Sequence, residues 1–401
     1  MSLIKKLNDA ISNQRIKAYK NLTKRLSINE IDNIRDDQGY SILHLAVIAK
    51  NSSVLQDLIH RKTNLKVTTN AGYTALHLAI TNFDDKSIAV IENLLKHKID
   101  IDAVNNRGET ALDLLILNDV IVLEDKVQIL KLLLENNPNI NITKERFTIL
   151  HTSAAKGYKE IIELLIDKVD INLKDDDGFT MLHLAVINNH SRVVELLLTH
   201  NANAHILAPG KMDILQIAVR KSYFETVNLL LKHNSSISGA VKELLINFAN
   251  TIIDEENSWT LTHISASRGY TEIIKLLLDN NIDITVRDNA GNTPLHLSAE
   301  SGCITITKYF IEKGANIKLP NSVGDTPLHL AIYSENYNYT VISILVKKGT
   351  PINIPNHEGI TSQELVDDIG DLILSKIFSQ ANTKIEEDEL ITIGDNAQHI
   401  S

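Results

Sequence analysis

The chain repeats one short phrase at a nearly fixed spacing. Residues 291–299 read GNTPLHLSA, and the phrase returns in residues 324–331 as GDTPLHLA. Altered copies occupy residues 39–46, 72–79 and 178–185. The Leu before the His recurs at intervals of 33 residues, as in Leu43 to Leu76 and Leu295 to Leu328. A period of this length predicts a solenoid, in which each unit buries its apolar face only against its neighbours.

Each part of the phrase predicts a local structure. Thr293 is suited to cap a helix N-terminus, and Pro294 fits the first helical turn, where no backbone donor is needed. Gly302 supplies the left-handed turn that ends this first helix. A second helix is expected over residues 306–313, and a projecting turn over residues 315–324. One repeat is therefore a helix pair followed by a hairpin-like turn.

The Thr-Pro-Leu-His core and the 33-residue period resemble the ankyrin-repeat family. The resemblance implies an all-α fold, an ankyrin-repeat solenoid of stacked helix-turn-helix units with projecting β-hairpin loops. It also implies non-catalytic protein–protein recognition on the concave surface that the hairpins and inner helices form. The Asn-, Ile- and Lys-rich composition resembles ankyrin proteins of intracellular bacteria or large DNA viruses, which implies a host-directed effector as one form of this function.

The repeat phrase divides the chain into three parts. Residues 1–36 lack the phrase and predict N-terminal capping helices, a degenerate repeat, whereas residues 37–382 form the array. Between Leu215 and the next marker, Thr262, the spacing widens to 47 residues, which predicts an extra helix near residues 240–253. Residues 383–401 are acidic and carry no packing pattern, so we expect a disordered tail.

Composition narrows the partners and the compartment. A formal net charge of −10 argues against a nucleic-acid partner, and the longest apolar run, residues 111–123, is too short and too polar to be a membrane segment. One cysteine, Cys303, and a first segment without a secretory core indicate a cytoplasmic protein, or one exported into a host cell without such a signal. The partner is thus expected to be a protein.

The sequence predicts no catalytic residue, no metal site and no cofactor. Most histidines fall either in the repeat phrase or in the last turn of a second helix, and no zinc-ligand spacing occurs. No phosphate-binding or dinucleotide-binding glycine motif occurs either. The one enzyme hypothesis left open is a site in the inserted segment near residues 240–258, where Asp254, Glu255 and Glu256 cluster.

One position collects large side chains. The residue between the turn Gly and the capping Thr, which we call the hairpin register, holds five aromatics in a chain that is only 4% aromatic. In the first seven repeats it is occupied by Tyr40, Tyr73, Glu109, Phe147, Phe179, Met212 and Trp259, and then by Asn292, Asp325 and Ile360. We predict partner binding by Tyr40, Tyr73, Phe147, Phe179, Met212 and Trp259, because aromatic clusters dominate binding energy at interfaces. The alternative is that these rings only pack on the next hairpin.

A structural or self-associating protein is the other function that the sequence leaves open. The first 27 residues carry many basic side chains, and the tail carries the acidic run 386–389. The basic end of one copy could therefore meet the acidic tail of another.

Overall fold

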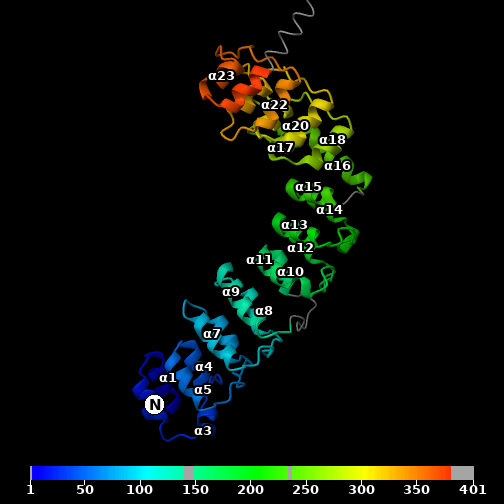
Figure 1. Ribbon diagram of the computed structural model, residues 1–401. Coiled ribbons are helices and arrows are strands. Elements are labelled where there is room, and N and C mark those ends of the chain that lie inside the picture. Colours follow the sequence, from blue (N-terminus) through cyan, green and yellow to red (C-terminus); the bar gives the residue numbers. More distant parts are fainter. Residues whose placement is uncertain (1, 140–148, 234–236, 381–401) are drawn as a thin grey trace, which may run out of the picture. The chain divides into compact units, whose positions relative to one another are not determined.

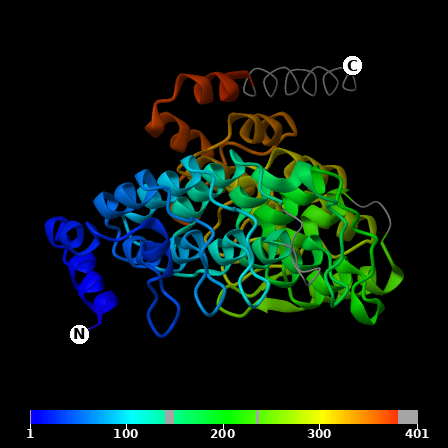
Figure 2. The same ribbon diagram turned by 90° about the horizontal axis from the view of Figure 1, so that it is seen from below.

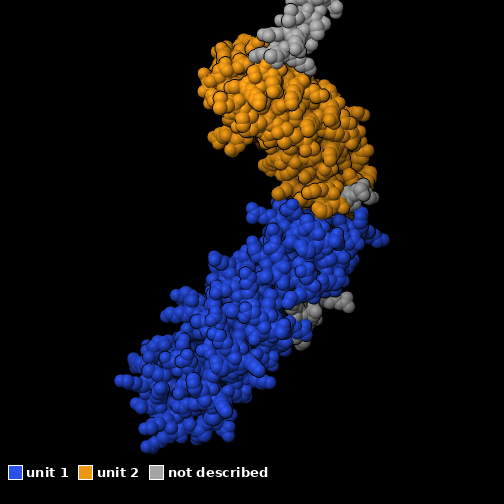
Figure 3. All heavy atoms as spheres, viewed as in Figure 1, with its two compact units in different colours: residues 1–212 blue, residues 213–401 orange. Residues whose placement is uncertain are grey.

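The computed structural model of the chain describes residues 2–139, 149–233 and 237–380 (Figure 1). By its internal contacts the chain divides into two compact units, residues 1–212 and 213–401, which Figure 3 colours separately. Each unit is described here by itself. No helix within the described ranges is long and apolar enough to cross a membrane.

The first unit consists of helices and short connecting hairpins. Its helices are α1 (Leu3–Ser12), α2 (Ile16–Thr23), α3 (Ile28–Asn33), α4 (Ile42–Ile48), α5 (Ser52–His60), α6 (Ala75–Thr81), α7 (Ser87–Lys96), α8 (Ala111–Leu117), α9 (Leu123–Leu134), α10 (Ile149–Lys156), α11 (Lys159–Leu165), α12 (Met181–Ile187) and α13 (Ser191–Thr199). Two 3-10 turns, η1 (Ile166–Lys168) and η2 (Pro209–Lys211), complete it.

The second unit adds one small sheet to the same helical pattern. Its helices are α14 (Ile214–Arg220), α15 (Phe224–His233), α16 (Gly239–Asn250), α17 (Leu261–Arg268), α18 (Thr271–Asp279), α19 (Pro294–Glu300), α20 (Ile304–Glu312), α21 (Pro327–Tyr333), α22 (Tyr339–Lys347) and α23 (Ser362–Ile369). The strands β1 (Ile252–Asp254) and β2 (Trp259–Thr260) pair antiparallel.

The helices of each unit form an inner and an outer layer. In the first unit the inner helices α4, α6, α8, α10 and α12 contact one another in sequence, and the outer helices α7, α9, α11 and α13 do likewise. Figure 2 shows successive helix pairs of this unit side by side, with their connecting loops projecting. In the second unit α17, α19 and α21 continue one layer and α18, α20 and α22 the other. This is the all-α solenoid with hairpin loops that the repeat phrase predicts.

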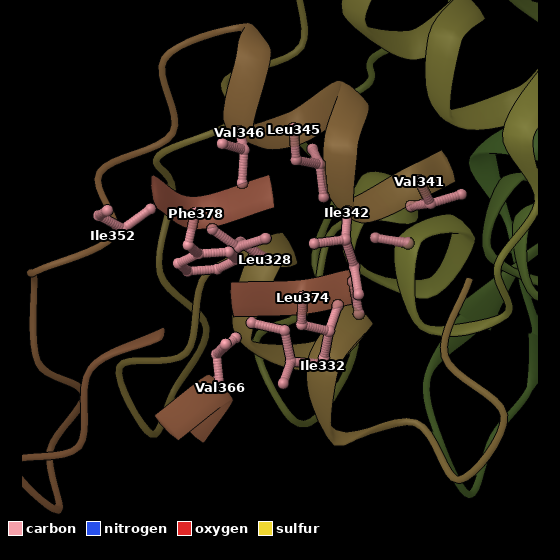
Figure 4. Packing of buried hydrophobic residues seen from close by; sticks show 12 residues of the cluster. Leu328, Ile332, Val341, Ile342, Leu345, Val346, Ile352, Val366, Leu374 and Phe378 are labelled. Atoms are coloured by element: carbon pink, nitrogen blue, oxygen red, sulfur yellow. The ribbon is translucent and has the colours of Figure 1, made fainter. Parts of the chain in front are cut away.

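The apolar core runs between the layers as a series of small clusters. In the last repeats, buried Leu328 and Ile332 of α21 pack with Ile342 and Leu345 of α22 and with Phe378 (Figure 4). Each of these side chains is at most 2% exposed. Because every cluster joins neighbouring helix pairs, stability is distributed along the array instead of being concentrated in one core.

The widened spacing contains the extra helix, but its end lies earlier than the sequence suggests. Helix α16 ends at Asn250, and Ile252 is already in strand β1, where it pairs with Thr260. The reason is that Thr251 adopts an extended backbone, which directs the chain into the next hairpin. Helix α16 contacts α14 and α17, whereas α15 contacts α18 directly. The insertion is thus a repeat that has an inner helix and lacks an outer one.

The ends of the array also differ in detail from a simple helix pair. The N-terminal part has three helices, α1 to α3, of which α1 packs on α4 and α2 on α5. Near the other end α23 stops at Gly370, whose φ of 66° is left-handed, and a further helix occupies residues 372–380. The acidic segment 383–401 lies outside the described residues.

Candidate functional site

Hairpin tips with Asp, Asn or Thr four residues before the register position are fixed by hydrogen bonds that the sequence encodes locally. In the first tip the Asp36 N–H donates to the Tyr40 carbonyl at 3.1 Å, and the Tyr40 N–H donates to Asp36 Oδ1 at 2.8 Å. Thr69, Asn105 and Asp175 supply the equivalent side-chain acceptor in later repeats of the first unit. In these tips the backbone of the hairpin-register residue is therefore held at both its N–H and its C=O.

Backbone hydrogen bonds also join neighbouring tips. The third residue before the register position donates its N–H to the preceding tip, as Asn70 does to the Gln38 carbonyl at 3.0 Å. The same bond is made by Asn106 to Ala71, Asn289 to Asn257, Ser322 to Ala290 and His357 to Val323. Pro209 occupies this donor position in the tip at residues 208–212 and has no N–H. Because Pro209 has no backbone N–H, this tip cannot donate the hydrogen bond to the preceding tip.

The histidine of the repeat phrase connects its helix to the following hairpin. In repeat two the Thr74 N–H donates to His77 Nδ1 at 3.2 Å, which makes Nδ1 an acceptor and places the ring proton on Nε2. Nε2 then donates to the Glu109 carbonyl at 3.1 Å. Equivalent Nε2 bonds run from His44 to Val67, His151 to Leu173, His183 to Ile206, His263 to Asn292 and His296 to Asp325.

These histidines are buried and neutral. Burial lowers the pKa of His44 and of His296 to about 4, against the backbone carbonyls that favour the protonated ring. Burial also lowers the pKa of His77, His151, His183, His263 and His329. Both ring nitrogens of His77 are occupied by backbone groups, so this ring serves the fold and is not poised for acid–base work. Within the described ranges no group of three or more His, Cys, Asp or Glu side chains could hold a metal ion.

Three aromatics of the hairpin register lie on the histidines of their own repeats. The ring of Tyr40 meets His44 edge-on with centroids 6.2 Å apart, Tyr73 meets His77 at 5.8 Å, and Phe179 meets His183 at 6.1 Å. All three side chains are half-buried. Within the described residues the hydroxyls of Tyr40 and Tyr73 make no hydrogen bond. Each of the three rings is thus packed against a histidine and remains partly exposed to solvent.

The other register residues have different surroundings. Met212 is 38% exposed at the tip that contains Pro209. In the second unit Trp259 donates from Nε1 to Asp288 Oδ2 at 3.1 Å and packs against the cluster of Leu295 and Phe310. Trp259 therefore packs on the next hairpin, as the structural alternative proposes for this position. Phe147 lies outside the described residues.

A hollow of about 480 Å³ adjoins the first hairpin, and the register pattern did not predict it. It lies between α1 and the hairpin that carries Tyr40, and its lining includes Lys5, Arg35, Asp37 and Leu45. Leu45 comes from the inner helix α4. The sequence shows a cluster of basic residues near the N-terminus. It does not show that Lys5 and Arg35 lie on the same cavity.

The acidic cluster of the insertion forms a turn. Asp254 accepts from the Asn257 side chain at 2.9 Å and from the Glu256 N–H at 3.1 Å, and these bonds hold the pKa of its carboxyl below the ordinary value. An ionised carboxylate that closes its own turn has the opposite of the raised pKa that a general acid needs. The geometry therefore offers the enzyme hypothesis no support at Asp254.

Stacked helix pairs joined by mutually bonded hairpins define this chain as a helical repeat solenoid. A family model described as ankyrin repeats (3 copies) matches overlapping segments at residues 7–105, 43–144, 85–175, 117–209, 168–240, 234–321 and 287–356. The chain belongs to the ankyrin-repeat family, whose repeats are a non-enzymatic module that generally mediates protein–protein interaction.

A similar segment occurs in a curated protein, the nuclear factor NF-kappa-B p105 subunit of Gallus gallus. The two sequences are 38% identical over 64 residues, which is 16% of this chain. The matched segment spans only 6% of the length of that relative. This likeness therefore concerns the repeats and not the whole relative.

Proposed function

We propose that this protein is a non-catalytic scaffold that binds a protein partner through its hairpin and inner-helix surface. The observation that carries the proposal is the hairpin register of the first unit, where Tyr40, Tyr73 and Phe179 are half-buried and packed on buried histidines. Phe147 and Met212 share this register in the first unit and belong to the proposed surface, whereas Trp259 shares it in the second unit and is packed against the next hairpin.

The local geometry favours binding by these rings. Tyr and Phe have few rotatable bonds, and the edge-on contact with histidine already restricts them. Ordering these side chains when a partner binds would therefore cost little conformational entropy. The hydroxyls of Tyr40 and Tyr73 remain available for hydrogen bonds, since no described residue engages them. The hollow beside the hairpin that carries Tyr40 extends the surface with charged side chains of both signs, among them Lys5, Arg35 and Asp37.

The test is an affinity capture from a cell lysate with the intact chain and with the double variant Tyr73→Ala, Phe179→Ala. The proteins retained are quantified by mass spectrometry after circular dichroism has shown that both baits are folded. We expect at least one protein to be retained about tenfold less by the double variant, the loss that one or two interface anchors typically cause.

A matched control replaces an aromatic residue away from the register. Tyr309 lies on the outer helix α20, where its hydroxyl donates to Asp279 at 2.7 Å. The Tyr309→Ala bait should retain the same proteins as the intact chain. Equal retention by all three baits would contradict the assignment of the partner site to the register.

The proposal extends to partners of host origin. The Asn-, Ile- and Lys-rich composition supports this extension, because it resembles that of ankyrin proteins from intracellular bacteria and large DNA viruses. Capture from host and non-host lysates in parallel tests it: a partner retained only from the host lysate supports the effector role, and equal capture from both contradicts it.

A further inference from the structure

The last described repeat exposes three large aliphatic side chains around one turn. Ile369 is 43% exposed at the end of α23, and Leu372 and Ile373, at the start of the helix 372–380, are 85% and 53% exposed. Leu374 and Phe378 of that same helix are fully buried in the terminal cluster (Figure 4). The helix is thus packed on one side and apolar on part of its outer side.

Comparison with an earlier repeat shows what covers the position of Leu372 there. Leu372 follows its capping Thr361 by eleven residues, as Ile304 follows Thr293. The side chain of Ile304 packs against the cluster of the following repeats, which includes Leu328 and Val341. Leu372 is therefore in the position that contacts the next repeat, and within residues 237–380 no repeat follows it.

The end of the array is not apolar throughout. Asp367 is exposed at the position that Ala299 and Ile332 occupy, buried, in the two preceding repeats. Glu364 and Asp368 are also exposed, so the apolar turn has an acidic border. Such a border would repel another acidic surface and attract a basic one.

The first helices of the chain have the complementary character. Their exposed basic side chains are Lys5, Lys6, Arg15, Lys17, Lys20, Lys24 and Arg25. Leu3 is 38% exposed there, and it lines a hollow of about 390 Å³ together with Leu26 and Ile34 and with the polar residues Asn29, Glu30 and Asn33. A hollow with a partly apolar lining thus lies beside basic residues in the first helices, and an apolar projection beside acidic residues lies in the last described turn.

We propose that the turn carrying Leu372 and Ile373 binds the N-terminal helices of a second copy of this chain. The aliphatic side chains would enter the hollow lined by Leu3 and Leu26, while Asp367 and Asp368 face the basic residues of α1 and α2. Different surfaces of the two copies meet, so the contact is heterologous and leaves one free end on each side. Copies therefore add head to tail, and the assembly grows with concentration.

Sedimentation velocity of the full chain over a wide concentration range, at low and at high salt, tests this contact. The weight-average mass should rise with concentration at low salt and fall at high salt, because salt screens the charges that border the contact. Leu372→Asp and Leu3→Asp should each weaken association by about tenfold or more, because each places a charge in an apolar contact. Both side chains are exposed in the isolated chain, so neither change should unfold it.

Mixing the two variants distinguishes head-to-tail growth from other modes. Each variant keeps one intact end, so an equimolar mixture should form particles of two copies and none larger. Val120→Asp is the control, since Val120 is 81% exposed on the turn between α8 and α9 and should leave association unchanged.

Three outcomes would overturn the proposal. One is a monomer at every concentration, as expected if residues 381–401 of the same chain cover the turn. Another is association that is lost in Leu372→Asp but kept in Leu3→Asp, which would mean symmetric pairing of C-terminal ends. The third is association that neither substitution affects.

Discussion

The imidazole Nε2 of His296 lies 3.2 Å from the carbonyl oxygen of Asp325, a residue of the following hairpin. On its other side Nδ1 accepts the N–H of Thr293, the capping residue of the same helix, at 3.1 Å. One buried ring therefore closes a helix start and binds the next repeat. A protonated Nδ1 could not accept the Thr293 N–H, so the connection requires neutral imidazole.

The array should lose stability in mild acid. The pKa of His44 and of His296 is about 4 in the folded chain and about 6.5 when unfolded, so between these values only the unfolded state binds the proton. The stabilisation is complete above pH 6.5 and is lost as the pH falls toward 4. By pH 5 we expect a loss of about 2 kcal/mol from each of the two rings. Urea unfolding at a series of pH values measures it, and a flat profile from pH 7 to 5 would contradict it.

Replacing His296 by Ala should destabilise the second unit strongly. The change leaves the buried Thr293 N–H without its acceptor, removes one of the two donors to the Asp325 carbonyl and opens a cavity, for a loss of about 3 to 5 kcal/mol. The variant should also show less acid sensitivity, because one of the titrating rings is gone. His205 is exposed, so His205→Ala is the control and should change stability by less than about 0.5 kcal/mol. Unfolding free energies from urea titrations decide between these values.

Lys126 should be a site where a mutation stabilises the protein. Its side chain is fully buried, and Nζ donates to the Ile116 carbonyl at 2.9 Å and lies 4.8 Å from the Tyr158 ring centroid. Burial lowers the pKa of this ammonium to about 8, and Lys156 contributes in the same direction. At neutral pH the charged form therefore opposes folding. Lys126→Met should raise the unfolding free energy by about 1 to 2 kcal/mol, less than the full desolvation cost because the bond to Ile116 is lost.

The pH dependence provides an independent check on Lys126. Because its folded pKa lies below the unfolded value, the stability of the natural chain should rise as the pH increases from about 8 toward 10.5. The Lys126→Met variant should lack this rise. If both proteins show the same alkaline profile, the ammonium is not the cause.

The repeat phrase predicts the helix starts because the relevant interactions are local. A capping Thr, a Pro in the first turn and a His three residues after the cap satisfy the helix N-terminus from within a few residues. Even the exceptions follow this logic. Asp113 replaces the His in repeat three and still accepts the Thr110 N–H at 2.7 Å, and Glu364 does the same for Thr361 in the last repeat.

Layer and surface assignments depend on distant contacts, and the sequence alone does not predict them. The periodicity of residues 240–253 indicates a helix, but only packing places α16 between α14 and α17 and begins strand β1 at Ile252. Similarly, Trp259 and Tyr73 occupy the same register position in the sequence, but their surroundings differ. Trp259 bonds to Asp288 of the next hairpin, whereas Tyr73 lies against the His77 of its own repeat. The exposure of Leu372 follows from the lack of a following repeat within the described residues, which its local sequence does not indicate.

Substitutions at two glycines of the second unit can distinguish the cost of backbone strain from the cost of a steric clash between hairpins. Gly291 and Gly314 both have left-handed backbone, with φ of 77° and 88°. A Cβ on Gly291 would lie 2.7 Å from the backbone N of Ser322, which hydrogen-bonds the Ala290 carbonyl, whereas a Cβ on Gly314 would meet nothing within 4 Å. Gly314→Ala should therefore cost only the conformational penalty, about 1 kcal/mol.

Gly291→Ala should cost the same penalty and a further loss of about 1 to 3 kcal/mol, because the adjacent hairpin must move away. Urea unfolding gives the two totals, and hydrogen exchange locates the difference. The Ser322 amide should exchange faster in Gly291→Ala than in Gly314→Ala, since only the first substitution displaces its bond to Ala290. Equal unfolding free energies, with equal exchange at Ser322, would mean that the tips are not in the close contact that joins one repeat to the next.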